Sequence, residues 1–118
     1  MITLYGIKTC STVRKARDWL KQHNIDYHYH DHRFDGVDPM QLRLWVHELG
    51  WQTLLNKRST TWRTLPAKTR ENMDETLALA VMEDQPTIIK RPLLDLGTER
   101  FVGFSEKHYQ RLFSPPCV

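Results

Sequence analysis

The chain has 118 residues, a formal net charge of +3 and a pI near 9.0. This length predicts one domain (1–118) with its own core, and two cysteines are too few for a secreted disulfide framework. We recognise no signal peptide or membrane-spanning run, so we expect a cytoplasmic protein with reduced thiols and no membrane partner. The mild positive charge suits a small anion or an acidic thiol, and no dense basic run indicates nucleic-acid binding.

The first predicted element is a strand over residues 2–5, in which apolar and polar residues alternate. Gly6 can end this strand without steric cost. A helix to about His23 follows, because apolar residues recur at helical spacing from Val13 onward and Asn24 is a suitable stop.

Cys10 lies in the turn between this strand and this helix, followed by Ser11 and Thr12, which are good N-cap residues. A thiol there faces unpaired backbone N–H groups and the positive end of the helix dipole, and both favour the thiolate. Lys8 and Arg14 are nearby cations that add to this effect. We therefore interpret Cys10 as a nucleophile, with a small buried hydrophobic residue as the alternative.

A second strand is predicted over residues 25–32 by strict alternation, and it would pair in parallel with the first. Three histidines share one face of it: His28, His30 and His32. Such a set can bind a metal, but no cysteine or carboxylate lies beside it at ligand spacing, so we expect no metal. We interpret the histidine face as the solvated side of an edge strand, with Tyr27 and Tyr29 facing inward.

Residues 38–84 predict a helical insertion. Its first helix begins with Asp38 as N-cap and Pro39 at the first helical position, and Gln41 would complete a capping box. We then expect a short helix over 51–55, a polar loop over 56–61, a helical turn opening at Pro66 and a helix capped by Asp74.

The last part of the chain predicts a β-hairpin, with strands over 93–96 and 100–104. Ser105 can cap a final helix, and residues 114–118 form a flexible tail. The order of elements is therefore βαβ, helical insertion, ββα.

Arg91 and Pro92 come directly before the first hairpin strand. Guanidinium offers a planar fork of donors, so this pair would make a good anion clamp. If the hairpin pairs beside the first strand, Arg91 approaches Cys10. The alternative is a surface arginine before an ordinary trans proline.

Four ordered motifs resemble the arsenate-reductase-like (ArsC) family, and within it the Spx/YffB branch: Leu4–Cys10, Leu54–Arg58, Ile88–Leu94 and Gly103–Glu106. The resemblance extends to about Phe113. It implies an α/β thioredoxin-like, glutaredoxin-type fold with a four-stranded mixed sheet.

The resemblance also implies roles for individual residues. Cys10 matches the catalytic cysteine, and Arg91 matches the arginine that contacts the oxyanion or thiolate. Pro92 matches the cis-proline of the superfamily, with Pro86 as the alternative. Around them we expect a substrate-binding set and no cofactor; the set comprises Lys8, Thr9, Ser11, Thr12, Arg58 and Pro92.

Three positions depart from the family pattern. Asn56 and Gly103 stand where arsenate reductases of this type carry arginines, which argues against an arsenate substrate unless Arg58 compensates. Val13 stands where Spx-type regulators carry a second cysteine, which argues against redox control of RNA polymerase.

The sequence therefore predicts a thiol-disulfide oxidoreductase with a single catalytic cysteine. Such a site needs a second thiol, which the resemblance to the YffB branch assigns to glutathione as co-substrate; Cys117 is the internal alternative. We expect a monomer whose partner is glutathione or a protein disulfide. Arsenate reduction and Spx-like binding of RNA polymerase are the alternative functions.

Overall fold

The computed structural model describes residues 2–114, so Cys117 and the predicted tail beyond Ser114 lie outside the described residues. The strands are β1 (Thr3–Gly6), β2 (His28–Asp31), β3 (Leu93–Asp95) and β4 (Arg100–Val102). The helices are α1 (Ser11–Gln22), α2 (Pro39–Leu49), α3 (Trp51–Leu54), α4 (Thr60–Thr64), α5 (Ala67–Glu71), α6 (Glu75–Asp84) and α7 (Glu106–Phe113), with a 3-10 turn η1 (Pro86–Ile88) before β3.

The four strands form one mixed sheet in the order β2-β1-β3-β4. β1 pairs in parallel with β2, because α1 returns the chain to the same end of the sheet, whereas β3 and β4 form an antiparallel hairpin beside β1. Leu4 faces both Tyr29 and Leu94 across these pairs. The βαβ–insertion–ββα order and the thioredoxin-like α/β fold are thus confirmed.

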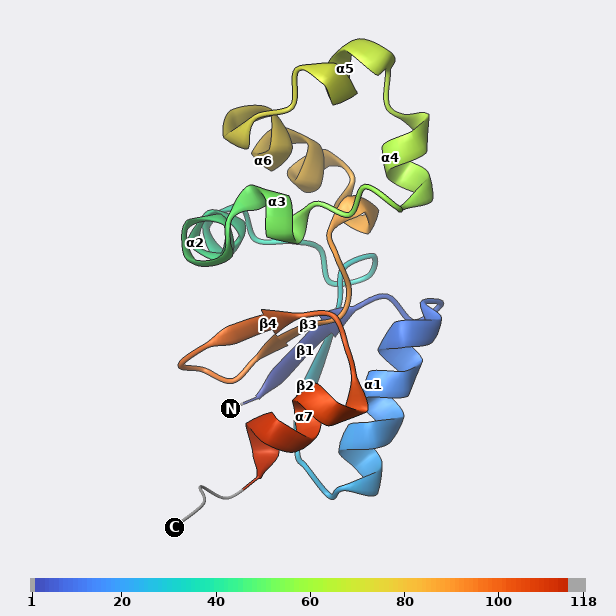
Figure 1. The fold of residues 1–118 in the computed structure, drawn as a ribbon, viewed down its shortest axis with the longest axis vertical. Coiled ribbons are helices and arrows are strands. Elements are labelled where there is room, and N and C mark those ends of the chain that lie inside the picture. The colour runs from blue at the N-terminus through green and yellow to red at the C-terminus, as the bar shows by residue number, and fades with distance from the viewer. Residues whose placement is uncertain (1, 115–118) are drawn as a thin grey trace.

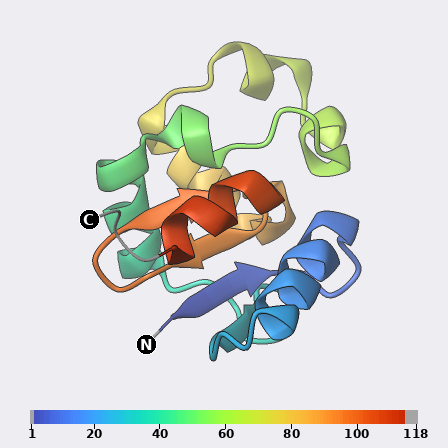
Figure 2. The same cartoon turned by 60° about the horizontal axis from the view of Figure 1, so that its bottom comes forward.

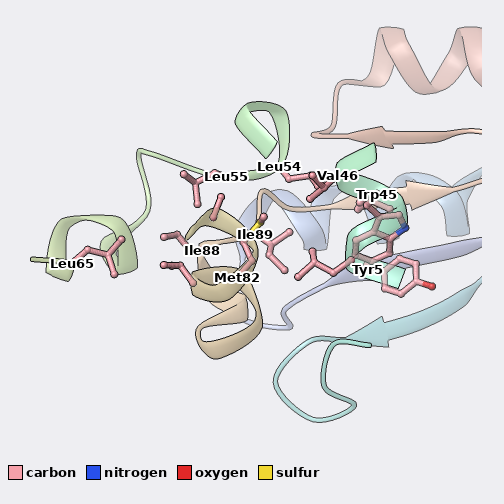
Figure 3. Close-up of a cluster of buried hydrophobic side chains, with 13 residues drawn as sticks. Tyr5, Trp45, Val46, Leu54, Leu55, Leu65, Met82, Ile88 and Ile89 are labelled. Atoms are coloured by element: carbon pink, nitrogen blue, oxygen red, sulfur yellow. The ribbon is translucent and has the colours of Figure 1, made fainter. Parts of the chain in front are cut away.

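Helices cover both faces of the sheet (Figure 1). Helices α1 and α7 lie over one face, where Leu4, Trp19 and Tyr109 form a buried cluster (Figure 2). The insertion packs on the other face, where Tyr5 and Trp45 join a larger cluster with side chains of α3, α6 and η1 (Figure 3). Because strand side chains alternate, adjacent residues of β1 serve the two clusters.

The second strand is shorter than predicted. Residues 25–27 are not part of it, because the backbone N–H of Ile25 donates to the Leu20 carbonyl and closes the end of α1. Asn24 adopts a φ of 56°, so its prediction as the helix stop is confirmed. The hairpin strands are also shorter than expected, but their pairing is as predicted.

Two predictions in the insertion need correction. Thr60 and Thr61 belong to helix α4 rather than to a loop, because the Ser59 hydroxyl accepts a hydrogen bond from the Trp62 N–H and caps that helix. Gln41 does not complete a capping box; its side-chain amide donates to the Tyr5 hydroxyl at 2.8 Å instead. The Asp38 and Asp74 caps are confirmed.

The prediction of a solvated histidine face is wrong beyond His28. His30 is half-buried and contacts the Gly36 carbonyl through Nε2, and His32 is 2% exposed. The physical reason is that α2 covers this face: Trp45 of α2 packs edge-on against Tyr5, and His32 stacks on Tyr5 with ring centroids 6.0 Å apart and lies 6.4 Å from Trp45. Tyr27 and Tyr29 face the α1 cluster, as predicted.

Over residues 2–114, no helix has the length and apolar character that a membrane crossing requires.

Candidate active site around Cys10

Cys10 is the N-cap residue of α1 and is half-buried. Its backbone N–H donates to the Ile7 carbonyl, which forms the tight turn after β1, and its own carbonyl accepts from Arg14 in the first helical bond. Gly6 is needed before this turn because a Cβ there would lie 2.7 Å from a methyl carbon of Val13. The close contact between β1 and α1 fixes where the helix begins, and with it the position of the thiol.

The surroundings of Cys10 favour its thiolate. Partial burial raises the pKa of the thiol, but the backbone N–H of Val13, the Arg91 guanidinium and the backbone N–H of Thr12 lower it further than burial raises it. The net result is a pKa below the ordinary cysteine value. Since the thiolate is the nucleophile, this arrangement suits attack on sulfur or on another electrophile.

Arg91 reaches the thiol because β3 pairs beside β1, as the sequence predicted. Its guanidinium also donates to the Thr87 carbonyl at 2.5 Å, which holds the side chain over the Cys10 turn. The Arg91–Pro92 peptide bond is cis, so the trans alternative is wrong, and Pro86 opens the 3-10 turn instead. Gly103, with a φ of 85°, donates its N–H to the Pro92 carbonyl.

A polar pocket of about 490 Å³ opens beside Arg91. Ten residues line it: Ile7, Thr9, Arg33, Asn56, Arg58, Ser59, Thr60, Thr61, Thr87 and Arg91. The structure therefore brings Thr9 and Arg58 of the predicted substrate-binding set together with Arg91.

The other residues of that set lie elsewhere. The Lys8 ammonium lies over the Phe34 ring, 5.3 Å from its centroid, outside the pocket. Ser11 is exposed at the first position of α1, and Thr12 contributes its backbone N–H to the thiolate. Pro92 is buried directly after Arg91.

Two residues near Cys10 were missed by the sequence reasoning. Asp31 is 2% exposed, and its carboxylate accepts the backbone N–H of Lys8 at 3.0 Å and that of Arg33 at 2.8 Å. It thereby ties the Cys10 turn to the turn after β2, from which Arg33 reaches the pocket. The signal was available: the carboxyl ends of parallel strands meet at one edge of a sheet, so a cation just after the second strand belongs near Cys10.

Within residues 2–114, no group of three or more His, Cys, Asp or Glu side chains is arranged to hold a metal ion. The pocket is lined by hydroxyl-bearing residues and by three arginines, of which Arg91 also contacts the Cys10 thiol.

A half-buried, activated cysteine at the start of the first helix, with a cis-proline beside it, defines a thioredoxin-like protein with a single described thiol in its site. The chain belongs to the ArsC family, whose model matches residues 5–112. An uncharacterized protein of Haemophilus influenzae is 47% identical over 114 residues, covering 97% of this chain and 100% of that protein.

Other relatives differ in what their names state. The global transcriptional regulator Spx of Staphylococcus haemolyticus is 30% identical over 121 residues, covering 94% of this chain and 86% of the regulator. A solved structure named YFFB has a TM-score of 0.90 at 44% identity and covers 94% of this chain and 97% of its own. An arsenate reductase (ArsC) related protein from Brucella melitensis has a TM-score of 0.79 at 40% identity, with coverage of 97% and 95%.

Proposed function

We propose that this protein is a thiol-disulfide oxidoreductase in which Cys10 exchanges with a disulfide and glutathione resolves the product. The observation that carries the proposal is the lowered pKa of Cys10, which follows from two backbone N–H groups and the Arg91 guanidinium. The reducing cytoplasm, where glutathione is the common small thiol, is the compartment we propose for it.

The proposed reaction has two balanced exchanges. The Cys10 thiolate attacks one sulfur of a mixed disulfide between a protein and glutathione, so that a Cys10–glutathione disulfide forms and the protein thiolate leaves and takes a proton from water. A glutathione thiolate then attacks the glutathione sulfur of this intermediate, which yields oxidised glutathione and regenerates the Cys10 thiolate. In sum, the protein–glutathione disulfide and one glutathione thiol are converted to a protein thiol and oxidised glutathione, and Cys10 is regenerated.

The position of Val13 supports an external resolving thiol. A second cysteine of a Cys-x-x-Cys motif would stand at this position, but Val13 is a fully buried side chain packed against Gly6. Cys117 lies outside the described residues and remains the internal alternative.

The first test is the pH dependence of Cys10 alkylation by iodoacetamide. We expect the midpoint in the wild type below that of a free cysteine near 8.5 and a higher midpoint in Arg91→Gln, because the variant loses the guanidinium. Arg70→Ala, an exposed arginine on α5, is the matched control and should alkylate like the wild type. A wild-type midpoint equal to that of a free thiol contradicts the proposal.

The second test identifies the resolving thiol. Incubation with oxidised glutathione should give a single glutathione adduct by intact mass, and Cys10→Ser should abolish it. An internal Cys10–Cys117 disulfide instead would show that the chain resolves its own intermediate.

A partner-binding function is the second candidate, supported by the 30% identity to the Spx regulator. Binding of RNA polymerase that persists in Cys10→Ser would favour it over the enzyme.

A further inference from the structure

The pocket beside Arg91, the arginine that contacts the Cys10 thiol, has a charge of one sign. Its ten lining residues include Arg33, Arg58 and Arg91, and they include no aspartate or glutamate. Both ion pairs found among residues 2–114 belong to Arg100, the first residue of β4, so among these residues no carboxylate pairs with Arg33 or Arg58. A pocket with several cations and no internal counter-charge favours an anionic ligand.

The three arginines are not equivalent. Arg91 is engaged with the Thr87 carbonyl and with the Cys10 sulfur. Arg33 and Arg58 are exposed, and they approach the pocket from separate segments, the turn after β2 and the loop after α3. Two cations on separate segments suit a ligand with more than one negative group, or with one group that spans them.

The backbone at both exposed arginines is held in place. The N–H of Arg33 donates to the buried Asp31 carboxylate at 2.8 Å, and the N–H of Arg58 donates to the Asn56 side-chain oxygen at 3.0 Å. These bonds order the main chain, and within residues 2–114 no hydrogen bond or ion pair engages either guanidinium group. Arginine in such a position binds carboxylates through paired N–H donors.

We propose that Arg33 and Arg58 form a carboxylate-binding subsite that makes the exchange at Cys10 selective for peptide disulfides carrying carboxylates. This proposal rests on the thiol-disulfide exchange proposed above and adds the class of substrate. Thr9 and Thr60, which line the same pocket, add hydroxyl groups as candidate donors to the ligand.

The test compares two disulfides with the same reacting sulfurs, oxidised glutathione and its diethyl ester, in which both glycine carboxylates are blocked. The rate of Cys10 adduct formation is measured by intact mass at disulfide concentrations below saturation. We expect the wild type to prefer the acid, and we expect Arg33→Ala and Arg58→Ala each to reduce this preference by about three- to fivefold, the size typical of one solvent-exposed charge pair. Comparing the ratio between variants cancels the intrinsic difference in reactivity between the two disulfides.

Two controls make the result specific. Arg70→Ala removes an exposed arginine outside the pocket and should keep the wild-type preference. Added salt should reduce the preference of the wild type more than that of the double variant Arg33→Ala/Arg58→Ala, because exposed charge pairs are screened.

The outcomes separate the two proposals. An adduct that forms equally fast with both disulfides, or a preference that Arg33→Ala and Arg58→Ala leave unchanged, overturns the carboxylate subsite and leaves exchange at Cys10 intact. Absence of any Cys10 adduct with either disulfide overturns the proposed function itself.

Discussion

Gly6→Ala tests the contact that sets the start of α1 and hence the position of Cys10. An added Cβ would lie 2.7 Å and 2.8 Å from the two methyl carbons of Val13, and both residues are buried. Overpacking of this kind costs about 1–3 kcal/mol, while the lower entropy of the unfolded chain returns about 0.4–1 kcal/mol. We therefore expect Gly6→Ala to lower the free energy of unfolding by about 1–2 kcal/mol.

The companion variant is Val13→Ala, which removes both methyl groups. Alone it loses about 2–3 kcal/mol, from the buried methyl groups and the space they leave. In Gly6→Ala/Val13→Ala the nearest remaining contact is the Val13 Cβ position at 3.3 Å, and the new methyl group fills part of the space. The double variant should therefore lose less than the sum of the single losses, by about 1 kcal/mol or more.

Urea unfolding of the four proteins under reducing conditions measures this coupling. Gly97→Ala is the matched control: its cost comes from a φ of 92° with no neighbour within 4 Å, so its effect should simply add to that of Val13→Ala. Gly6→Ala should also raise the pKa of Cys10, because displacing the first turn of α1 weakens the Val13 N–H contribution. A neutral Gly6→Ala, or strictly additive losses in the double variant, would refute the close-contact argument.

Three further predictions concern buried polar groups and a cap. Burial lowers the pKa of His32 from 6.5 to about 4, so the unfolded chain binds the proton more readily, and the stability that His32 contributes above pH 6.5 is lost as pH falls toward 4. His32→Phe should flatten this decline in a series of unfolding curves; an unchanged slope would show that His32 is not the group responsible. Burial raises the pKa of Asp31, but the backbone N–H groups of Arg33 and Lys8 outweigh it and hold the pKa below its usual 3.8, so its contribution is present above pH 3.8 and lost below it. Asp31→Asn should therefore lose about 1–3 kcal/mol at pH 7 and show less acid sensitivity below pH 3.8, which acid titration of the fold would check. Ser105→Ala should cost about 1 kcal/mol in urea, because it removes the acceptor for the His108 N–H at the start of α7; no change would mean that water replaces the cap.

Local signals were sufficient for the order of the elements and for the centre of the site. Alternation located the first two strands, and the Asp38, Asp74 and Ser105 caps each begin a helix where the sequence placed one. The approach of Arg91 to Cys10 followed from pairing the hairpin with the first strand. These features depend on periodicity and on residues close in sequence, which is why they could be predicted.

The features that were missed depend on docking between distant segments. Nothing in the sequence of residues 25–32 indicates that α2 covers the histidine face. The burial of His32 could be predicted only by knowing where Trp45 packs. The sequence suggested that Gly6 ends a strand. In the structure its lack of a side chain allows Val13 to pack against it. Arg33 is the one missed residue that could have been predicted. Because the first two strands pair in parallel, the turns that follow them, with Cys10 and Arg33, lie at the same edge of the sheet.

The positions of Val13 and of the pocket arginines bear on the same question, which thiol completes the reaction. The backbone N–H of Val13 lowers the pKa of the Cys10 thiol while the Val13 side chain is fully buried, so the second position of a Cys-x-x-Cys motif here serves activation and packing. In the proposed exchange the resolving thiol comes from elsewhere and enters through the pocket that Arg33 and Arg58 line. In the proposed subsite, those charges favour a thiol that carries carboxylates over a neutral one. The proposal thus has two parts: Cys10 is activated without a second cysteine beside it, and the incoming thiol passes a positively charged pocket. The charge of that thiol then decides how fast it reacts.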